Sequence, residues 1–256
     1  MDYENFFKLG FVNEFNVEIN KEITLLQQKI YDLTKNIIID HDTNLNLIEK
    51  IKLPFKEIPS EKIWSELMNE INSSNELKNL INSKGIYSVF KNIFKNPEIF
   101  EICTFRARIP NQKRVIYNWH QDEGTWFLSK NKKINNKFSA TMWLSINGSN
   151  YNNSIQLVKG SHNGKLFNHS YVDGQGYFKA ENLNIINNSN IYNVKTSPSQ
   201  AVLFHPLTLH RSVPNAQDKP DMYPRYSVDI RYYDKSSKLD YKTTLLFKLK
   251  KLIKKL

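Results

Sequence analysis

The sequence predicts an α+β protein in which a helical N-terminal region precedes an antiparallel β unit, either a sandwich or a jelly roll. Between residues 18 and 38, apolar residues recur every three or four positions, as they do on one face of a helix. From residue 99 to residue 235, short β-rich stretches alternate with clusters of Asn, Gly, Ser and Pro. Strands at intervals of roughly ten residues indicate an antiparallel unit. We therefore expect helices over 1–98 and a β core over 99–235, packed together as one domain over 1–238.

The helical region contains two long periodic runs and two shorter ones. The apolar stripe of the first run consists of Ile19, Ile23, Leu26, Ile30, Leu33 and Ile37. The second run follows Ser60, a residue type that favours the N-cap position. Its apolar face is expected to carry Ile63, Trp64, Leu67 and Ile71. Shorter helices are expected over 76–81 and 89–94, the latter ending before Pro97.

Four stretches of the β core have the clearest strand pattern. They are rich in β-branched and aromatic residues and cover 141–146, 154–158, 201–204 and 226–232. The Asn-rich segment 182–193 is expected to be a loop.

Composition places the chain among ordinary globular proteins. Of its 256 residues, 40% are hydrophobic and 24% are charged. A chain of this length buries roughly three quarters of its unfolded surface. The single cysteine, Cys103, rules out a disulfide within the chain and fits a reducing compartment. The N-terminus lacks the pattern of a signal peptide, and no apolar run is long enough to span a bilayer. We expect a cytoplasmic protein, with peripheral contact at the inner membrane surface as an alternative.

The formal net charge of +11 has two interpretations. A basic protein can bind nucleic acid, an anionic membrane surface or an anionic substrate. However, most of the basic residues are lysine, and Asn and Ile are also abundant, which is the bias expected from A/T-rich codons. The chain has no RNP, zinc-finger or helix-turn-helix signature, so nucleic-acid binding is not expected.

A candidate metal site lies around His120 and Asp122. Residues two apart on a strand face the same side, so both side chains are expected to point into the β unit. A third ligand is available from His205 or His210. His205 is five residues earlier, where an extended strand faces the opposite way, and it precedes a proline, so His210 is favoured. Two histidines and one carboxylate form the facial triad of non-haem Fe(II) oxygenases, although an H-x-D pair alone is a weak signal.

Several motifs strengthen this hypothesis because they occur in a familiar order. They are the opening segment 3–12, Trp119-His120-Gln121-Asp122, the strand 141–146, Gly160-Ser161-His162, and His210–Asn215 followed by Arg225-Tyr226-Ser227. From residue 3 to about residue 233 the chain resembles the phytanoyl-CoA dioxygenase family of Fe(II)/2-oxoglutarate-dependent oxygenases. It departs from the family pattern at Asn152-Asn153-Ser154, where Asn-Gly is common. The gap between His210 and Arg225 is also long, as expected from an inserted loop around 218–222.

The resemblance implies a cupin-like double-stranded β-helix, or jelly-roll, with the N-terminal helices packed on one sheet. It also implies that His120, Asp122 and His210 hold Fe(II), with 2-oxoglutarate as cosubstrate and O2 as oxidant. Arg225 and Ser227 are expected to bind the distal carboxylate of 2-oxoglutarate, because a guanidinium fork and a nearby hydroxyl suit a carboxylate. The alternative cation is Arg231.

Other residues near these motifs have weaker assignments. Arg106 and Arg108 alternate on one face, so they either contact the cosubstrate or an anionic substrate from inside the barrel, or are surface charges. The resemblance implies that Trp143 lies near the cosubstrate. Trp143 and Trp126 either line the pocket in this way or simply pack in the β core. Three further histidines are assigned no role in catalysis: His162 is expected to be structural, and His41 and His169 have no supporting context.

The expected function is a 2-oxoglutarate-dependent dioxygenase that hydroxylates an unactivated C–H bond of a small-molecule or lipid- or sugar-conjugated substrate, releasing succinate and CO2. Related halogenases leave the carboxylate position to chloride, so the retained Asp122 argues for hydroxylation. Three rival interpretations remain open. One is a catalytically silent family member that acts as a membrane-associated binding or scaffold protein. The others are a non-enzymatic membrane- or nucleic-acid-binding protein and a jelly-roll isomerase using Zn or Mn.

The C-terminal segment 239–256 differs from the rest of the chain. Leu245, Leu249, Leu252, Ile253 and Leu256 form one stripe, and lysines occupy much of the remainder. We expect a basic amphipathic helix, which either lies on an anionic membrane or packs on the protein or on a second subunit.

Overall fold

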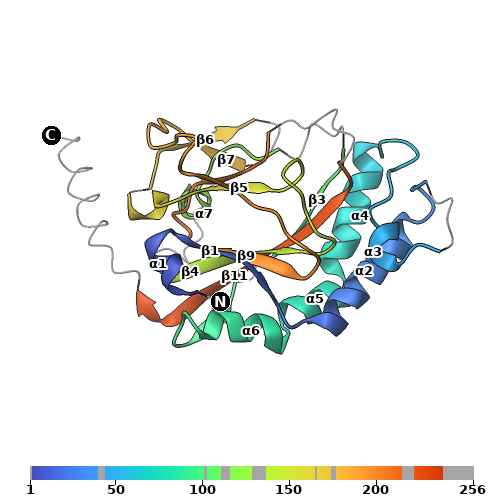
Figure 1. Ribbon diagram of the computed structural model, residues 1–256, viewed down its shortest axis with the longest axis horizontal. Coiled ribbons are helices and arrows are strands. Elements are labelled where there is room, and N and C mark those ends of the chain that lie inside the picture. The colour runs from blue at the N-terminus through green and yellow to red at the C-terminus, as the bar shows by residue number, and fades with distance from the viewer. Residues whose placement is uncertain are drawn as a thin grey trace.

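The largest element of the computed structural model is a six-stranded antiparallel sheet, with helices on one face and a smaller sheet opposite the other (Figure 1). The structure describes residues 2–39, 44–100, 103–110, 116–128, 137–164, 166–173, 177–214 and 222–238. The expected C-terminal helix therefore lies outside the described residues.

The large sheet has the strand order β1-β9-β4-β11-β2, and β3 also pairs with β11. These strands are β1 (Phe11–Asn16), β2 (Pro97–Ile99), β3 (Thr104–Arg108), β4 (Lys137–Ser145), β9 (Gln200–Phe204) and β11 (Arg225–Lys238). Along β11, Tyr226, Val228 and Ile230 are buried in the core that the sheet shares with the helices. Because side chains alternate along a strand, Arg225 and Arg231 are on the opposite face, where they line a cavity.

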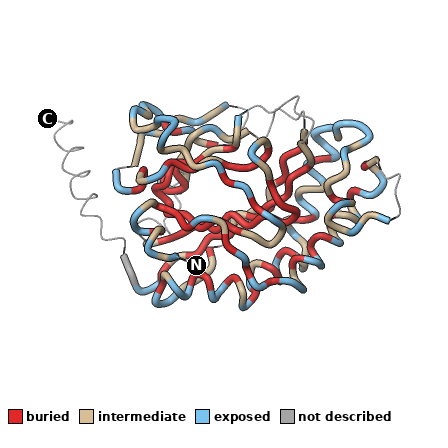
Figure 2. Tube along the Cα trace, viewed as in Figure 1, coloured by how far each residue is buried: buried red, intermediate tan, exposed pale blue. Residues whose placement is uncertain are grey.

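The helices cover the outer face of this sheet. They are α1 (Glu4–Lys8), α2 (Asn20–Thr34), α3 (Leu47–Lys50), α4 (Glu61–Ser73), α5 (Asn75–Ile81) and α6 (Lys84–Lys91). In three of them a serine hydroxyl caps the first turn, and the predicted cap Ser60 is one of these, accepting a hydrogen bond from the backbone N–H of Ile63. Figure 2 shows that the helices bury their sheet-facing sides and expose their outer sides.

Two details of the predicted helices are wrong. Ile63 is 46% exposed, whereas Trp64 and Ile71 are buried. Consecutive helical residues point about 100° apart, which places Ile63 at the edge of the apolar stripe that contains Trp64 and Ile71. The helix predicted over 89–94 instead begins at Lys84, where Ser83 caps it, and ends at Lys91.

The N-terminal region is not entirely helical, contrary to the expectation for 1–98. Phe11–Asn16 forms β1, which pairs antiparallel with β9 of the β core. Its Phe11, Val12 and Phe15 are buried. Gly10 precedes the strand with φ +90°, a conformation that favours glycine. A strand this short, paired with a partner nearly two hundred residues away, carries little signal in its local sequence.

The smaller sheet has the order β10-β5-β8, formed by β10 (His210–Ser212), β5 (Ile155–Val158) and β8 (Ile191–Asn193). A buried apolar cluster joins it to the large sheet and includes Trp143 of β4, Leu157 of β5 and Phe204 of β9. Two sheets packed face to face confirm the expected jelly-roll class. The segment 182–193 is mostly turns, as predicted, but its last three residues form β8.

The remaining described elements lie at one end of this sandwich. They are α7 (Asp122–Leu128), the short 3-10 helix Ser161–Asn163, and a ribbon of β6 (His169–Val172) and β7 (Tyr177–Ala180). Among the described residues, no helix is long and apolar enough to cross a membrane.

Candidate metal centre and cosubstrate pocket

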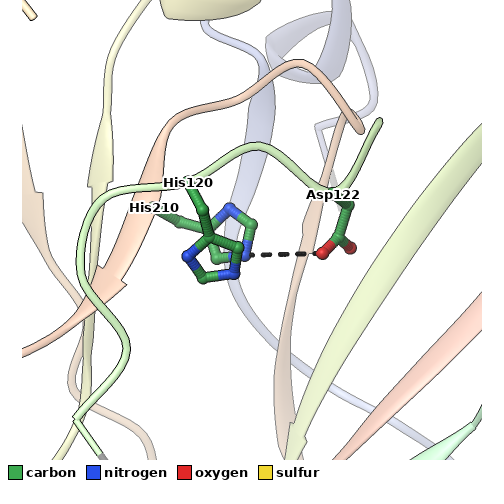
Figure 3. Close-up of side chains that lie close together, drawn as sticks. All are labelled: His120, Asp122 and His210. Atoms are coloured by element: carbon green, nitrogen blue, oxygen red, sulfur yellow. Dashed lines mark ion pairs between the residues drawn. The ribbon is translucent and has the colours of Figure 1, made fainter. Parts of the chain in front are cut away.

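The structure brings His120, Asp122 and His210 together (Figure 3). His120 and His210 form an antiparallel bridge, with backbone N–H···O distances of 2.9 and 3.0 Å in the two directions. Their ring centroids are 4.1 Å apart. His210 Nε2 lies 3.8 Å from Asp122 Oδ1, and the three ligand atoms all lie within 4.8 Å of one another. One metal ion could therefore contact all three side chains.

Hydrogen bonds orient both imidazoles for metal binding. His120 Nδ1 lies 2.8 Å from the carbonyl oxygen of Asn118, and His210 Nδ1 lies 3.0 Å from that of Thr208. A carbonyl oxygen only accepts, so each Nδ1 carries a hydrogen and each Nε2 is the ring nitrogen left to bind a metal. Burial, together with the neighbouring His210, lowers the pKa of His120 to about 3. The ring is therefore neutral at physiological pH, as a ligand must be.

Asp122 does not lie on a strand with His120, so that expectation is wrong. The chain leaves the extended conformation after His120, and Asp122 is the first residue of α7. Its Oδ2 accepts hydrogen bonds from the Thr141 hydroxyl and from Arg231 Nε at 3.3 Å. Burial raises the pKa of the Asp122 carboxyl, but Arg231 and the two histidines lower it more, so the net pKa is below its ordinary value. The carboxylate is ionised and its second oxygen, Oδ1, faces the histidines.

Gln121, between two of the ligands, was not predicted as a site residue. Its side chain is fully buried, donates to the Leu207 carbonyl at 2.7 Å and accepts from the Phe167 N–H at 2.8 Å. Its backbone N–H donates to His169 Nε2 at 3.1 Å. His169, which had no assigned role, therefore helps to fix the ligand loop. The position of Gln121 between two predicted ligands could have identified it as a site residue. Nothing in the local sequence indicated a role for His169.

Ser161 fixes the other ligand segment. Its hydroxyl donates to the Val158 carbonyl at 2.7 Å and accepts from the N–H of Leu209, the residue before His210, at 2.9 Å. Its neighbour His162 contacts the Phe7 carbonyl oxygen through Nε2 at 2.8 Å, away from the metal ligands, in agreement with the structural role expected for it.

His205, the competitor of His210, lies outside the cluster of three. Its Nδ1 accepts a hydrogen bond from the Leu207 N–H at 3.1 Å, and its ring packs against Phe6 and Phe138. Burial lowers the pKa of His205 to about 3. The geometry therefore favours His210 as the third ligand.

A cavity of about 280 Å³ opens beside the three ligands. Its wall includes the aromatic side chains of Tyr117, Trp143, Tyr177 and Phe204. Such a cavity combines apolar walls with a few polar groups, as small-molecule sites do.

Arg225 lies at this cavity and is buried. Its Nε donates to the Asn153 carbonyl at 3.0 Å, its Nη1 to the Ser227 hydroxyl at 2.5 Å, and its guanidinium lies 5.2 Å from the centre of the Trp143 ring. Burial, with the charge of Arg108 second, lowers the pKa of Arg225 to about 9, so it stays cationic at neutral pH. Among the described residues it contacts no carboxylate, which leaves a buried cation suited to an anion.

Arg106 and Arg108 both face the interior of the β unit. Arg106 lines the cavity, where it donates to Asp229 at 3.2 Å and to the Tyr117 hydroxyl at 2.7 Å. Arg108 is buried directly opposite Arg225 in the β3–β11 pairing, and its Nη1 has no hydrogen-bond partner in the described part of the chain. The geometry therefore favours an interior position for both residues.

Arg231, the alternative cation for the cosubstrate, is engaged elsewhere. It contacts Asp122 at 3.3 Å and Asp229 at 3.5 Å. The geometry thus favours Arg225 over Arg231 as the cosubstrate cation. His41 lies outside the described residues, and so does the Trp126 side chain.

The sequence profile of the phytanoyl-CoA dioxygenase (PhyH) family matches residues 27–221, which is most of the chain. The chain belongs to the phytanoyl-CoA dioxygenase family. The resemblance inferred from the ordered motifs is thereby confirmed. A search of the curated proteins gives no match.

Solved structures of low sequence identity share the fold. A structure titled non-heme monooxygenase ThoJ, apo, matches with a TM-score of 0.61 at 14% identity, covering 92% of this chain and 78% of that one. EvdO2 from Micromonospora carbonacea var. aurantiaca, complexed with 2-oxoglutarate, matches with a TM-score of 0.57 at 14% identity, covering 93% and 92%. The α-ketoglutarate-dependent carbocyclase SnoK from nogalamycin biosynthesis matches with a TM-score of 0.54 at 14% identity, covering 96% and 88%.

Membership in the phytanoyl-CoA dioxygenase family confirms the expected cofactor class, Fe(II) with 2-oxoglutarate as cosubstrate. The residues present fit that metal. Two imidazole Nε2 atoms and one carboxylate oxygen make up the donor set of a facial triad, and all three residues line the adjoining cavity. The chain is therefore an oxygenase-type enzyme of this family.

Proposed function

We propose that this enzyme hydroxylates an unactivated C–H bond of a small molecule while converting 2-oxoglutarate and O2 to succinate and CO2. In this reaction one oxygen atom enters the product and the other enters succinate. The observation that carries the proposal is the convergence of His120, Asp122 and His210 beside a cavity that also contains the buried cation Arg225, which contacts no carboxylate in the described part of the chain.

Each residue of the proposed site has a separate task. His120, Asp122 and His210 would hold Fe(II), which supplies the oxidising chemistry when it is bound. Arg225 and Ser227 would bind the distal carboxylate of 2-oxoglutarate through charge-assisted hydrogen bonds. This anion would offset the buried charge of Arg225, whose described hydrogen bonds go to a carbonyl oxygen and a hydroxyl.

Arg108 and Trp143 would support the same anion. Arg108 lies across from Arg225 and adds positive potential, and the Trp143 ring lies against the Arg225 guanidinium. Phe204 and Ile155 give the cavity apolar walls, which favour exclusion of water from the reacting groups.

The substrate would enter along Tyr117 and Tyr177, whose rings pack edge to face 4.8 Å apart in the cavity wall. Aromatic rings suit the apolar face of a small molecule or of a lipid- or sugar-conjugated compound. Ring closure is the second candidate outcome, because the fold is shared with a carbocyclase.

The proposal is tested with enzyme that has been loaded anaerobically with Fe(II) and 2-oxoglutarate. This enzyme is mixed with a candidate substrate and then exposed to O2. We expect succinate release that depends on Fe(II), and a product that gains one oxygen atom derived from labelled O2. A product that loses two hydrogens without gaining oxygen would favour ring closure or desaturation. Folded, iron-loaded protein that never forms succinate from 2-oxoglutarate would contradict both outcomes.

A further inference from the structure

Asp122 has two carboxylate oxygens with different surroundings. Oδ1 faces the histidines and lies 3.8 Å from His210 Nε2. Oδ2 accepts hydrogen bonds from the Thr141 hydroxyl and from Arg231 Nε. Each carboxylate oxygen has about two lone-pair positions, so these two donors saturate Oδ2.

The two donors form a matched cross-strand pair. Thr141 of β4 and Arg231 of β11 are directly opposite each other in the antiparallel register, on the sheet face that lines the cavity. Thr141 is fully buried, and the Arg231 and Asp122 side chains are 9% and 5% exposed. Water therefore has little access with which to replace either donor.

A further ion pair holds Arg231 in place. Its Nη2 contacts Asp229 at 3.5 Å, and Asp229 in turn contacts Arg106 at 3.2 Å. Because Arg231 is fixed from two sides, swinging away from Asp122 would break both contacts.

We infer that Arg231 and Thr141 act as a clamp that keeps Asp122 a monodentate metal ligand, an inference that rests on the proposed function. With Oδ2 occupied, only Oδ1 is available to the metal. A bidentate Asp122 would fill one of the open positions of the facial triad that 2-oxoglutarate and O2 need. Arg231 and Thr141 are thus positioning residues, which act on the metal through Asp122.

The test uses nitric oxide as a stable probe of the open position. Nitric oxide is titrated anaerobically into protein loaded with Fe(II) and 2-oxoglutarate, and the adduct is followed by electron paramagnetic resonance. Fe(II) affinity is measured separately. In Arg231→Gln we expect nitric oxide affinity to fall at least about tenfold more than Fe(II) affinity, on the scale of effects from partners of metal ligands.

Three further variants separate positioning from packing. Thr141→Val, a substitution of similar shape that removes only one donor, should give an intermediate loss and serves as the test if Arg231→Gln does not fold. Arg231→Lys, which keeps a cationic donor, should restore much of the binding. Arg211→Gln is the matched control, because Arg211 also lines the cavity, but its described contacts are a hydrogen bond to Gln156 at 2.7 Å and the ring of Trp119, not Asp122.

The outcomes distinguish the inference from the function on which it rests. Wild-type nitric oxide binding in Arg231→Gln and Thr141→Val would overturn the clamp and leave the proposed function intact. A loss of Fe(II) affinity equal to the loss of nitric oxide affinity in both variants would also overturn it. Wild-type protein that takes up no Fe(II) would overturn the proposed function, and the clamp with it.

Discussion

At the scale of single residues, the site depends on which side-chain atoms have no hydrogen-bond partner among the described residues. The Nδ1 atoms of His120 and His210 are engaged with backbone carbonyls, so that both Nε2 atoms are free for a metal. Arg225 is a comparable case. Its described hydrogen bonds go to a carbonyl oxygen and a hydroxyl, so its positive charge is available to an anion. Buried polar groups normally have partners. At this cavity, the described hydrogen bonds therefore leave the two Nε2 atoms and the Arg225 cation available to the proposed metal and cosubstrate.

The role of Arg225 leads to a prediction about cosubstrate binding. Arg225→Gln should weaken 2-oxoglutarate binding to the Fe(II) protein by about 10- to 100-fold, because hydrogen bonds to a charged group are worth about 1.5–3 kcal/mol. Calorimetry or the visible absorption of the complex measures this loss. Pyruvate, which lacks the distal carboxylate, is the matched ligand and should bind both proteins equally. An equal loss for pyruvate would show that Arg225 does not contact that carboxylate.

At the scale of elements, the ligand loop is held by the first turn of α7 against β6. A Cβ on Gly124 of α7 would come within 2.3 to 2.5 Å of the His169 ring of β6. Two hydrogen-bond contacts fix that ring, one to the Gln121 N–H and one to the Phe167 carbonyl oxygen. The ring could therefore make room for a methyl group only by releasing Gln121.

We predict that Gly124→Ala destabilises the protein and weakens metal binding. Alanine favours a helix by about 1 kcal/mol over glycine, but overpacking costs about 1–3 kcal/mol. The free energy of unfolding should therefore decrease. Because Gln121 lies between two ligands, Fe(II) affinity should also fall about tenfold. Thermal unfolding and metal titration measure the two effects.

Gly164→Ala is the control for this prediction. Its added Cβ would have the Ser161 carbonyl oxygen as its nearest neighbour, at an ordinary distance of 3.4 Å. It should therefore leave the His169 ring and the Fe(II) affinity unchanged. Unchanged stability and metal affinity in Gly124→Ala would contradict the account of the ligand loop.

The elements also show how far the sequence could predict the structure. The strand 141–146 and the strand containing Arg225 and Ser227 were predictable because their β-rich patterns are strong and local. β1 was missed because its partner β9 is remote in sequence. The structure brings the three predicted ligands together, but the strand geometry expected for Asp122 was wrong because α7 begins there.

Contacts between segments distant in the sequence explain what was missed in the site. His169 reaches Gln121 across 48 residues, and Arg231 reaches Asp122 across 109. No local pattern encodes such contacts. Arg231 was considered for the cosubstrate because residue type alone cannot distinguish two arginines on the same face of one strand.

At the scale of the whole molecule, burial of histidines links stability to pH. His205 has a pKa of about 3 in the folded protein because burial disfavours its charged form, whereas an unfolded histidine has a pKa of about 6.5. Between these values the unfolded chain binds the proton and the folded chain does not. Stability is therefore full above pH 6.5 and falls as the pH decreases toward 3.

We predict that His205 alone removes about 2 kcal/mol of unfolding free energy between pH 7 and pH 5. Urea denaturation of metal-free protein at both pH values measures this loss. In His205→Asn the side-chain oxygen can still accept the Leu207 N–H, but the titrating group is gone, so the pH dependence should shrink by that amount. An identical pH dependence in both proteins would contradict the prediction.

The central claim, that His120, Asp122 and His210 hold Fe(II) beside a 2-oxoglutarate site, is tested most directly by an anaerobic titration. Metal-free protein is mixed with Fe(II) and 2-oxoglutarate, and the visible metal-to-ligand charge-transfer band is recorded. We predict a band in the wild-type protein and in His205→Asn, and its loss in folded Asp122→Ala and His210→Ala. Folded wild-type protein without a band, or a band that survives in His210→Ala and disappears in His205→Asn, would contradict the claim.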